Sequence, residues 1–153
     1  MKLYIKKVSR LFRITQSYLV NILVTQLQEK NWEILYQNYV NARRSGGGSQ
    51  GVIYHCFKII FDQFPDIVAV KGGTLLLIQV DLTFKEKYVN KLKKFKLQQD
   101  KLFNCIRNKL GLNLTTLELG VAFERKPRVS MNKLSNLHIW IYNLRSKSFK
   151  KIQ

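Results

Sequence analysis

The chain has 153 residues and a mass of 18.0 kDa, the size of one ordinary domain. Its 27 Lys and Arg against 9 Asp and Glu give a formal net charge of +18, which favours a polyanionic partner. Hydrophobic residues form 46% of the chain, which excludes the composition of a disordered protein, and no apolar run is long enough for a transmembrane helix. We therefore expect a single domain over residues 1–153 that does not enter a membrane.

The first predicted element is a helix from Thr15 to Lys30, because apolar side chains recur there at three- and four-residue steps. A strand from Trp32 to Val40 follows, rich in Ile, Leu, Tyr and Val. The glycine- and serine-rich segment from Arg43 to Gly51 is then either a plain hairpin turn or a mobile basic loop that orders on a phosphate backbone. Val52 to Phe61 is predicted to form a second strand.

A β-hairpin is predicted in the middle of the chain. A short strand from Asp66 to Val70 and a longer one from Thr74 to Leu82 flank the turn signal Gly72-Gly73. The longer strand contains a run of four consecutive apolar residues, which is typical of a central strand covered by helices on both faces.

The hydrophobic period becomes helical at Thr83 and stays so to Leu110, with Gly111 as the expected cap of one long helix that has a lysine-rich outer face. Two more strands are predicted, from Leu117 to Phe123 and from Leu137 to Tyr142. The resulting order, α-β-β-β-β-α-β-β, indicates a single α/β layer arrangement.

The two cysteines, Cys56 and Cys105, lack the close spacing of zinc ligands. One disulfide is possible, but two unpatterned cysteines are more often reduced core thiols, and we expect the latter. The basic N-terminus has no small-residue cleavage site, so it is read as part of the mature domain. These features together predict a cytoplasmic protein, in a bacterial or organellar interior.

The tract from Phe64 to Asp81 resembles the core of the PD-(D/E)XK nuclease superfamily. Pro65-Asp66 opens one strand of the hairpin, and the apolar strand that follows ends at the positions of the family's Glu-x-Lys pattern. The preceding helix and strand also resemble the family's, so the likeness spans residues 15–125. It implies an α/β fold with a restriction-endonuclease-like core, in which helices flank a mixed central β-sheet.

The resemblance also implies hydrolysis of DNA phosphodiester bonds with Mg²⁺ (or Mn²⁺), most like a small intron-encoded homing or restriction-type endonuclease. In this chemistry, oxygen ligands on two adjacent strands hold a cation that activates a water molecule. Asp66 matches the first acid, whereas Gln79 stands at the second acid position and Asp81 at the lysine position. Gln79 still offers a carbonyl oxygen, but Asp81 reverses the charge. Glu29, at the end of the first helix, is a further candidate ligand.

Three interpretations of this departure stay open. In the first, Asp66 and Asp81 bind the metal with Gln79 between them, and the following helix supplies the lysine, with Lys85 preferred over Lys87. In the second, Asp81 disables the site, and the chain is a catalytically inactive PD-(D/E)XK-like nucleic-acid-binding protein. In the third, Asp66 and Asp81 are structural residues of an unrelated α/β protein.

The expected partner is double-stranded DNA, since lysines on a helix face neutralise phosphates and arginines beside a loop can reach a groove. The residues predicted to contact nucleic acid are Arg43, Arg44, Lys87, Lys91 and Lys94. One small active site cuts one strand, so we also expect a homo-oligomer, either a dimer or a tetramer.

Overall fold

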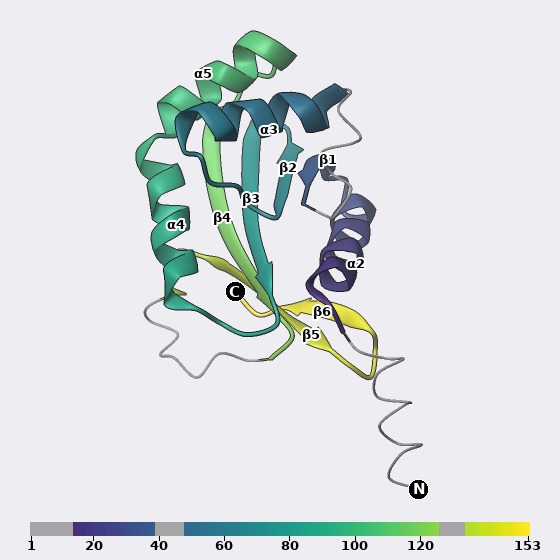
Figure 1. Ribbon diagram of the computed structural model, residues 1–153. Helices are drawn as coiled ribbons and strands as arrows, with labels where there is room; N and C mark the ends of the chain where they lie inside the picture. The colour runs from purple at the N-terminus through teal and green to yellow at the C-terminus, as the bar shows by residue number, and fades with distance from the viewer. Residues whose placement is uncertain (1–13, 39–47, 126–133) are drawn as a thin grey trace, which may run out of the picture.

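A computed structural model describes residues 14–38, 48–125 and 134–153. The elements in chain order are α2 (Gln16–Glu29), β1 (Glu33–Gln37), α3 (Gly48–Ile60), β2 (Ile67–Lys71), β3 (Thr74–Asp81), α4 (Glu86–Leu97), α5 (Gln99–Leu110), β4 (Thr116–Phe123), β5 (His138–Asn143) and β6 (Ser148–Lys151) (Figure 1).

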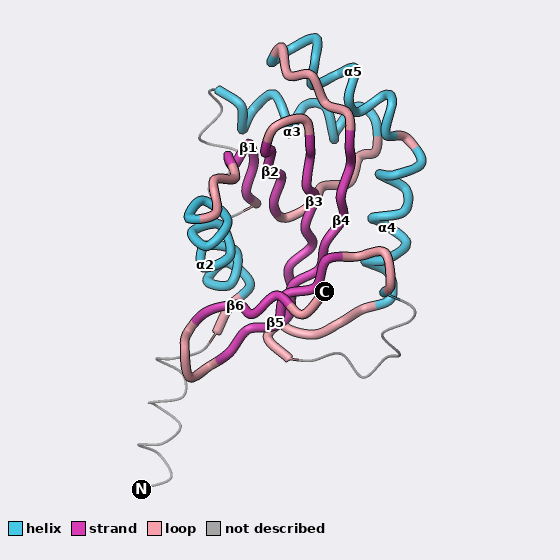
Figure 2. Tube along the Cα trace, turned by 180° about the vertical axis from the view of Figure 1, so that it is seen from behind, coloured by secondary structure: helices cyan, strands magenta, loops and turns pink. Residues whose placement is uncertain are grey.

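The strands form one six-stranded sheet in the order β1-β2-β3-β4-β5-β6. β3, β4 and β5 run parallel to one another, while β1, β2 and β6 each pair antiparallel with their neighbours. The α2 helix packs on one face, and α3, α4 and α5 pack on the other (Figures 1 and 2). The expected α/β fold, a mixed sheet flanked by helices, is therefore confirmed.

The β3 strand lies at the centre of the core, as its apolar run predicted. Its side chains alternate between the two faces of the sheet. Leu75 and Leu77 join the core under α3, α4 and α5, whereas Leu76 and Ile78 join the core under α2. Gln79 continues the first of these series, so its side chain points toward the face that α4 covers.

The predicted strand from Val52 to Phe61 is wrong, because this segment belongs to the α3 helix. Its β-branched and aromatic residues favour a strand by composition. However, Ile53, Cys56 and Phe57 are the buried side chains, and their spacing is that of one helix face.

The long helix predicted from Thr83 to Leu110 is two helices, which meet at Gln98. The hydrophobic period continues through the break, so the sequence pattern does not reveal it. The β6 strand was not predicted, since Phe149 is its only apolar residue. None of the described helices combines the length and the apolar character that crossing a bilayer requires.

The expectation of reduced thiols is also wrong. Cys56 on α3 and Cys105 on α5 form a disulfide, with their Cα atoms 6.0 Å apart. The two residues are 49 positions apart in the chain and meet because α3 packs against α5. No local spacing could have signalled this pairing.

Candidate active site

Three strand ends meet at one place on the sheet. Asn38 directly follows β1, Asp66 directly precedes β2, and Gln79 lies near the end of β3. The pairing of Ile67 with Ile78 sets Asp66 opposite Gln79. Backbone hydrogen bonds hold this register, since the Asp66 N–H donates to the Ile78 carbonyl at 3.0 Å and the Asn38 N–H donates to the Asp66 carbonyl at 2.7 Å.

The Asp66 carboxylate is only 2% exposed and accepts four hydrogen bonds. Its Oδ1 accepts from Gln16 Nε2 at 3.2 Å and from Asn38 Nδ2 at 3.3 Å. Its Oδ2 accepts from Gln79 Nε2 at 2.7 Å and from the Val80 N–H at 2.8 Å. These donors come from α2, from the residue that follows β1 and from β3, so they fix the carboxylate in a single orientation.

We call the hydrogen-bonded group around Asp66 the Asp66 cluster; it consists of Gln16, Asn38, Asp66 and Gln79. Lys91 reaches this cluster from α4. Its Nζ donates to Gln79 Oε1 at 2.9 Å, so Gln79 bridges a buried carboxylate and an ammonium. Burial lowers the pKa of Lys91, and the charge of Asp66 opposes that shift. Burial likewise raises the pKa of Asp66, against the hydrogen bond from Val80 and the charge of Lys91. The sequence placed Lys91 among the contacts to nucleic acid, and the structure places it beside the predicted metal ligands.

Asp81 has different partners. It follows Gln79 by two positions on β3, so both side chains leave the same face of the sheet. Asp81 Oδ1 accepts from the Leu82 N–H at 2.7 Å, and its Oδ2 accepts from the Tyr88 hydroxyl. Lys85, expected to complete the site, instead pairs its Nζ with Asp81 Oδ2 at 3.6 Å. The Lys85 ammonium and the Tyr88 hydroxyl therefore both stabilise the negative charge of Asp81, which stands at the family's lysine position.

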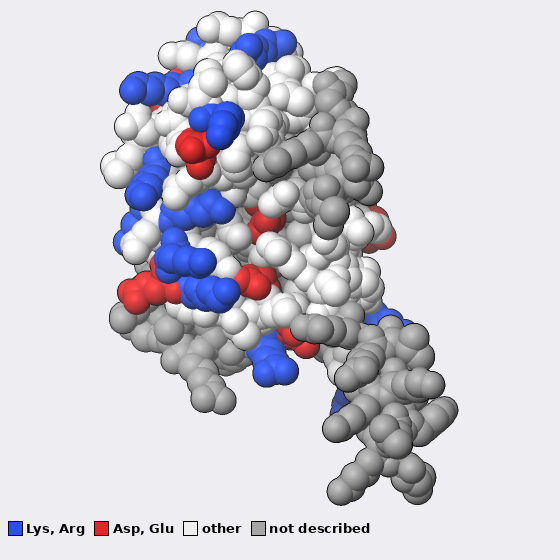
Figure 3. Space-filling model, viewed as in Figure 1, with Lys and Arg blue, Asp and Glu red and all other residues white. Residues whose placement is uncertain are grey.

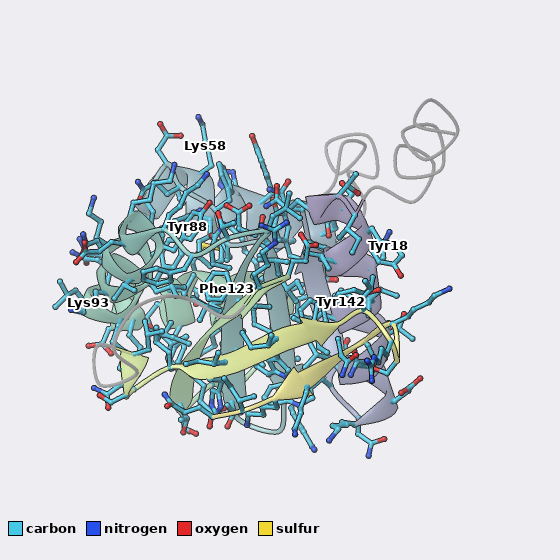
Figure 4. The ribbon with its side chains drawn as sticks, turned by 90° about the horizontal axis from the view of Figure 1, so that it is seen from below. Tyr18, Lys58, Tyr88, Lys93, Phe123 and Tyr142 are labelled. Carbon is cyan, nitrogen blue, oxygen red and sulfur yellow. A yellow bond between two sulfur atoms is a disulfide. The ribbon has the colours of Figure 1, made fainter. Side chains whose placement is uncertain are left out.

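Figure 4 looks onto the end of the molecule where β3 and β4 finish. Tyr88 lies on the α4 side of Phe123, while Tyr18 and Tyr142 lie on the α2 side. The hydroxyl oxygens of Tyr18 and Tyr142 are 3.0 Å apart, and burial raises the pKa of Tyr142 to about 12. This hydrogen bond connects the first turn of α2, which also contains Gln16, to β5 of the sheet.

Glu29 does not belong to the cluster. It is the last residue of α2, whereas Gln16, which contacts Asp66, is the first. A helix of 14 residues is about 20 Å long, so the two residues lie at opposite ends. The resemblance implies a Glu from the first helix at this site, and the helix contributes Gln16.

Sequence reasoning missed Gln16 and Asn38, whose partner Asp66 is 50 and 28 positions away. The nearest signal was the position of Gln16 beside Thr15, whose side chain caps the helix. Arg43 and Arg44, predicted to contact nucleic acid, lie outside the described residues.

The oxygen atoms around Asp66 fit a hard cation in donor type. They are its two carboxylate oxygens and the Val80 carbonyl, which accepts from Gln16 Nε2 at 2.9 Å. Gln79 turns its Nε2 toward Asp66 and its Oε1 toward Lys91. Mg²⁺ prefers such oxygen ligands and keeps several of its waters. Within the described residues, no group of three or more His, Cys, Asp and Glu side chains could hold a metal ion. A cation here would therefore depend on neutral oxygens beside one carboxylate.

Positive charge gathers beside this cluster. Figure 3 shows Lys and Arg side chains along the side of the molecule that α4 forms, with acidic side chains among them. Lys87 and Lys94, both predicted to contact nucleic acid, are exposed on α4. These two exposed charges lie on the same helix as Lys91.

The sequence matches no protein-family model and no curated protein. Among solved structures, the fold is similar to a crystal structure of an XisH family protein from Nostoc punctiforme, with a TM-score of 0.33 and 11% sequence identity. The match covers 89% of this chain and 99% of the other.

Proposed function

We propose that the chain is a divalent-metal-dependent DNA endonuclease of the PD-(D/E)XK type, site-specific in the manner of homing or restriction enzymes. The observation that carries the proposal is the hydrogen-bonded series Asp66–Gln79–Lys91, in which a buried carboxylate, an amide and an ammonium converge where β2 begins and β3 ends. Double-stranded DNA is the proposed substrate. A dimer or tetramer would present two such sites, one for each strand.

Each residue has a role in this proposal. Asp66 supplies the negative charge that attracts the cation, and the Val80 carbonyl supplies a neutral oxygen close to it, since Gln16 Nε2 donates to both. The Gln79 amide, which donates to Asp66 through its Nε2, would rotate to offer its oxygen to the cation. A Mg²⁺ (or Mn²⁺) bound there would supply Lewis acidity and lower the pKa of a bound water. Lys91 supplies a positive charge for the negative charge that develops on the phosphate.

Lys91 takes the role that the superfamily pattern gives to the lysine two positions after the second acid. In this chain that position is Asp81, which would repel a phosphate if its charge were unopposed. Lys85 and Tyr88 both contact its carboxylate, which reduces that repulsion. The departure at Asp81 is thus compatible with catalysis, provided that α4 supplies the ammonium.

A second candidate function is a catalytically inactive nucleic-acid-binding protein. The observation that favours it is the number of hydrogen bonds already made by Asp66, whose carboxylate must exchange some of them to hold a cation. The lysines of α4 would still bind a phosphate backbone in such a protein.

Plasmid cleavage in Mg²⁺ or Mn²⁺, measured beside a gel shift in EDTA, separates the two functions. We expect the wild type to cut, and both Asp66→Ala and Lys91→Ala to lose at least about 100-fold in rate, the usual effect of removing one stabilising charge or donor. Both variants should still shift DNA. Lys93→Ala is the matched control, since this exposed lysine lies on the same helix, and it should cut at the wild-type rate.

Binding without cleavage under either metal would overturn the nuclease in favour of the second candidate. Equal losses in Lys91→Ala and Lys93→Ala would remove the specific role of Lys91. Absence of any shift at low salt would contradict both functions.

A further inference from the structure

A small pocket lies on the other face of the sheet from Gln79 and Lys91. It has a volume of about 190 Å³ and opens where α2 packs over the sheet. Its apolar floor consists of Leu23 and Leu27 from α2 and Leu76 from β3, all of them buried. Trp32 and Trp140, the two tryptophans of the chain, both line it. Trp140 is 8% exposed and Trp32 is half-buried, so the pocket presents part of each indole to a ligand, separate from the Asp66 cluster.

The backbone is adapted to the position of Trp140. Gly120 lies inside β4, where glycine weakens a strand. A Cβ atom at this position would come within 2.5 Å of the Trp140 ring and 3.3 Å of the His138 carbonyl oxygen. The missing side chain therefore allows the indole to lie against β4 and form a wall of the pocket.

Lysine side chains surround the opening. Lys30 and Lys151 line the pocket, and Lys151 Nζ lies 5.8 Å from the centre of the Trp140 ring. Lys71 Nζ lies 5.9 Å from the centre of the Trp32 ring and donates to the Lys30 carbonyl at 2.9 Å. Two ammonium groups close to two indoles, with Lys30 also on the pocket wall, favour a ligand that joins an aromatic ring to an anion.

A carboxylate on the pocket wall adds a polar contact. Glu118 and His138 both line the pocket, and Glu118 Oε2 lies 3.1 Å from His138 Nε2. Their side chains are 37% and 29% exposed, so the pair is open to a ligand. A carboxylate accepts hydrogen bonds from the amino group of a nucleobase.

We infer that this pocket binds a nucleotide. The base packs against the tryptophans with its amino group toward Glu118, and the phosphate lies outside among the lysines. The pocket volume agrees with a base inside and a phosphate outside. Pockets that enclose drug-sized ligands measure about 300–1,000 Å³, and this smaller pocket has room for one ring system. A free nucleotide and a nucleotide unit of a nucleic acid share this chemistry. The inference goes beyond the proposed function, since no residue of the Asp66 cluster takes part.

Intrinsic tryptophan fluorescence reports directly on the pocket, because both indoles line it. We expect saturable quenching when the full chain in EDTA is titrated with dAMP, and no quenching by deoxyribose 5-phosphate, which lacks the base. An oligo-dA that binds more tightly than dAMP would identify a strand of nucleic acid as the source of the nucleotide. Equal affinity per nucleotide would identify a free nucleotide.

Two neighbouring lysines give a matched control. Lys151→Ala should weaken dAMP binding about fivefold by removing one charge beside the phosphate, whereas Lys150→Ala should leave it unchanged. Lys150 lies on the same strand, its side chain leaves the opposite face, and it does not line the pocket. Asp66→Ala should bind dAMP like the wild type, so a failure of the proposed nuclease does not affect this test.

Three results would overturn the inference. Quenching by dAMP that does not saturate would show that no site exists. Equal losses in Lys150→Ala and Lys151→Ala would show diffuse attraction by the basic surface. Equal quenching by deoxyribose 5-phosphate would show an anion site that makes no use of the tryptophans.

Discussion

Asp66 illustrates how two opposed effects act on one carboxyl group. Burial favours its protonated form, while the Val80 N–H, two side-chain amides and the charge of Lys91 favour the carboxylate. The balance raises the pKa above 3.8, so loss of water outweighs the hydrogen bonds. The ionised Asp66 carboxylate therefore lowers the free energy of unfolding relative to its protonated form. A bound cation would offset that cost, because it would interact with the charge in place of water.

The raised pKa predicts how stability depends on pH. Between pH 3.8 and the raised value, the folded state binds more protons than the unfolded state. The stability contributed by Asp66 is therefore fully present below pH 3.8 and is lost as the pH rises through the folded-state pKa. We expect the free energy of unfolding of the wild type, minus that of Asp66→Asn, to fall as the pH is raised from about 4 toward neutrality.

Urea denaturation of both proteins in EDTA over this pH range measures the difference. The asparagine variant is the reference because it keeps the shape of the side chain but does not titrate. A difference that rises with pH would mean that the hydrogen bonds and Lys91 outweigh burial.

The sequence predicts only some of the residue contacts in the site. Asp66 and Gln79 could be paired in advance, because the Gly72-Gly73 turn fixes the register of the strands on either side of it. Lys91 could not be singled out, since its approach to Gln79 depends on where α4 begins and how it packs on the sheet. The contacts of Gln16 depend in the same way on the placement of α2.

Among the elements, α3 and α5 are joined by a covalent bond. They are covalently joined by Cys56 and Cys105, and their apolar faces belong to one core. The loop from Phe61 to Pro65 connects the end of α3 to Asp66, so the position of α3 bears on the site. Composition predicted a strand for this segment because Val, Ile, Tyr and Phe dominate it, whereas packing against α5 favours the helix.

The disulfide predicts a measurable effect of reduction. In the chain-entropy account, a bond that closes a loop of 49 residues stabilises the folded state by about 4 kcal/mol, and measured effects are commonly 2–4 kcal/mol. We expect a tris(carboxyethyl)phosphine-treated sample to melt at a clearly lower temperature than the oxidised protein.

The Cys56→Ala/Cys105→Ala double variant is the control for this comparison, and its melting temperature should not respond to the reductant. If a thiol titration of the untreated, unfolded protein finds two free cysteines, the chain is reduced as isolated and the predicted effect is absent.

For the molecule as a whole, the excess of positive charge is unevenly distributed. The helix that the sequence predicted as one long basic face is divided, so the lysines of α4 and those of α5 lie on differently oriented elements (Figure 1). Lys91 of α4 contacts Gln79, so if the chain binds DNA as proposed, we expect the phosphate backbone to lie along α4.

Together with the proposed DNA substrate, this division predicts how the binding affinity depends on salt. Each lysine that neutralises a phosphate contributes about 0.9 to the slope of log affinity against log salt. Lys87→Ala/Lys94→Ala should therefore reduce the slope by about 2. Lys101→Ala/Lys109→Ala removes the same charge from α5 and should change the slope much less. Fluorescence anisotropy over a salt series measures both, and equal changes would mean that the whole surface attracts DNA without a preferred track.

The order of the strands has a consequence for how the chain reaches this structure. Each strand pairs with the one before it in the sequence, so no strand must be inserted between two that are already paired. A growing chain can extend the sheet at a single open edge from β1 to β6. Asp66, Gln79 and Lys91 are all synthesised before β4, whereas Trp140 and Lys151 come from the last two strands. The residues of the Asp66 cluster can therefore come together before the tryptophan pocket, whose walls also need β5 and β6.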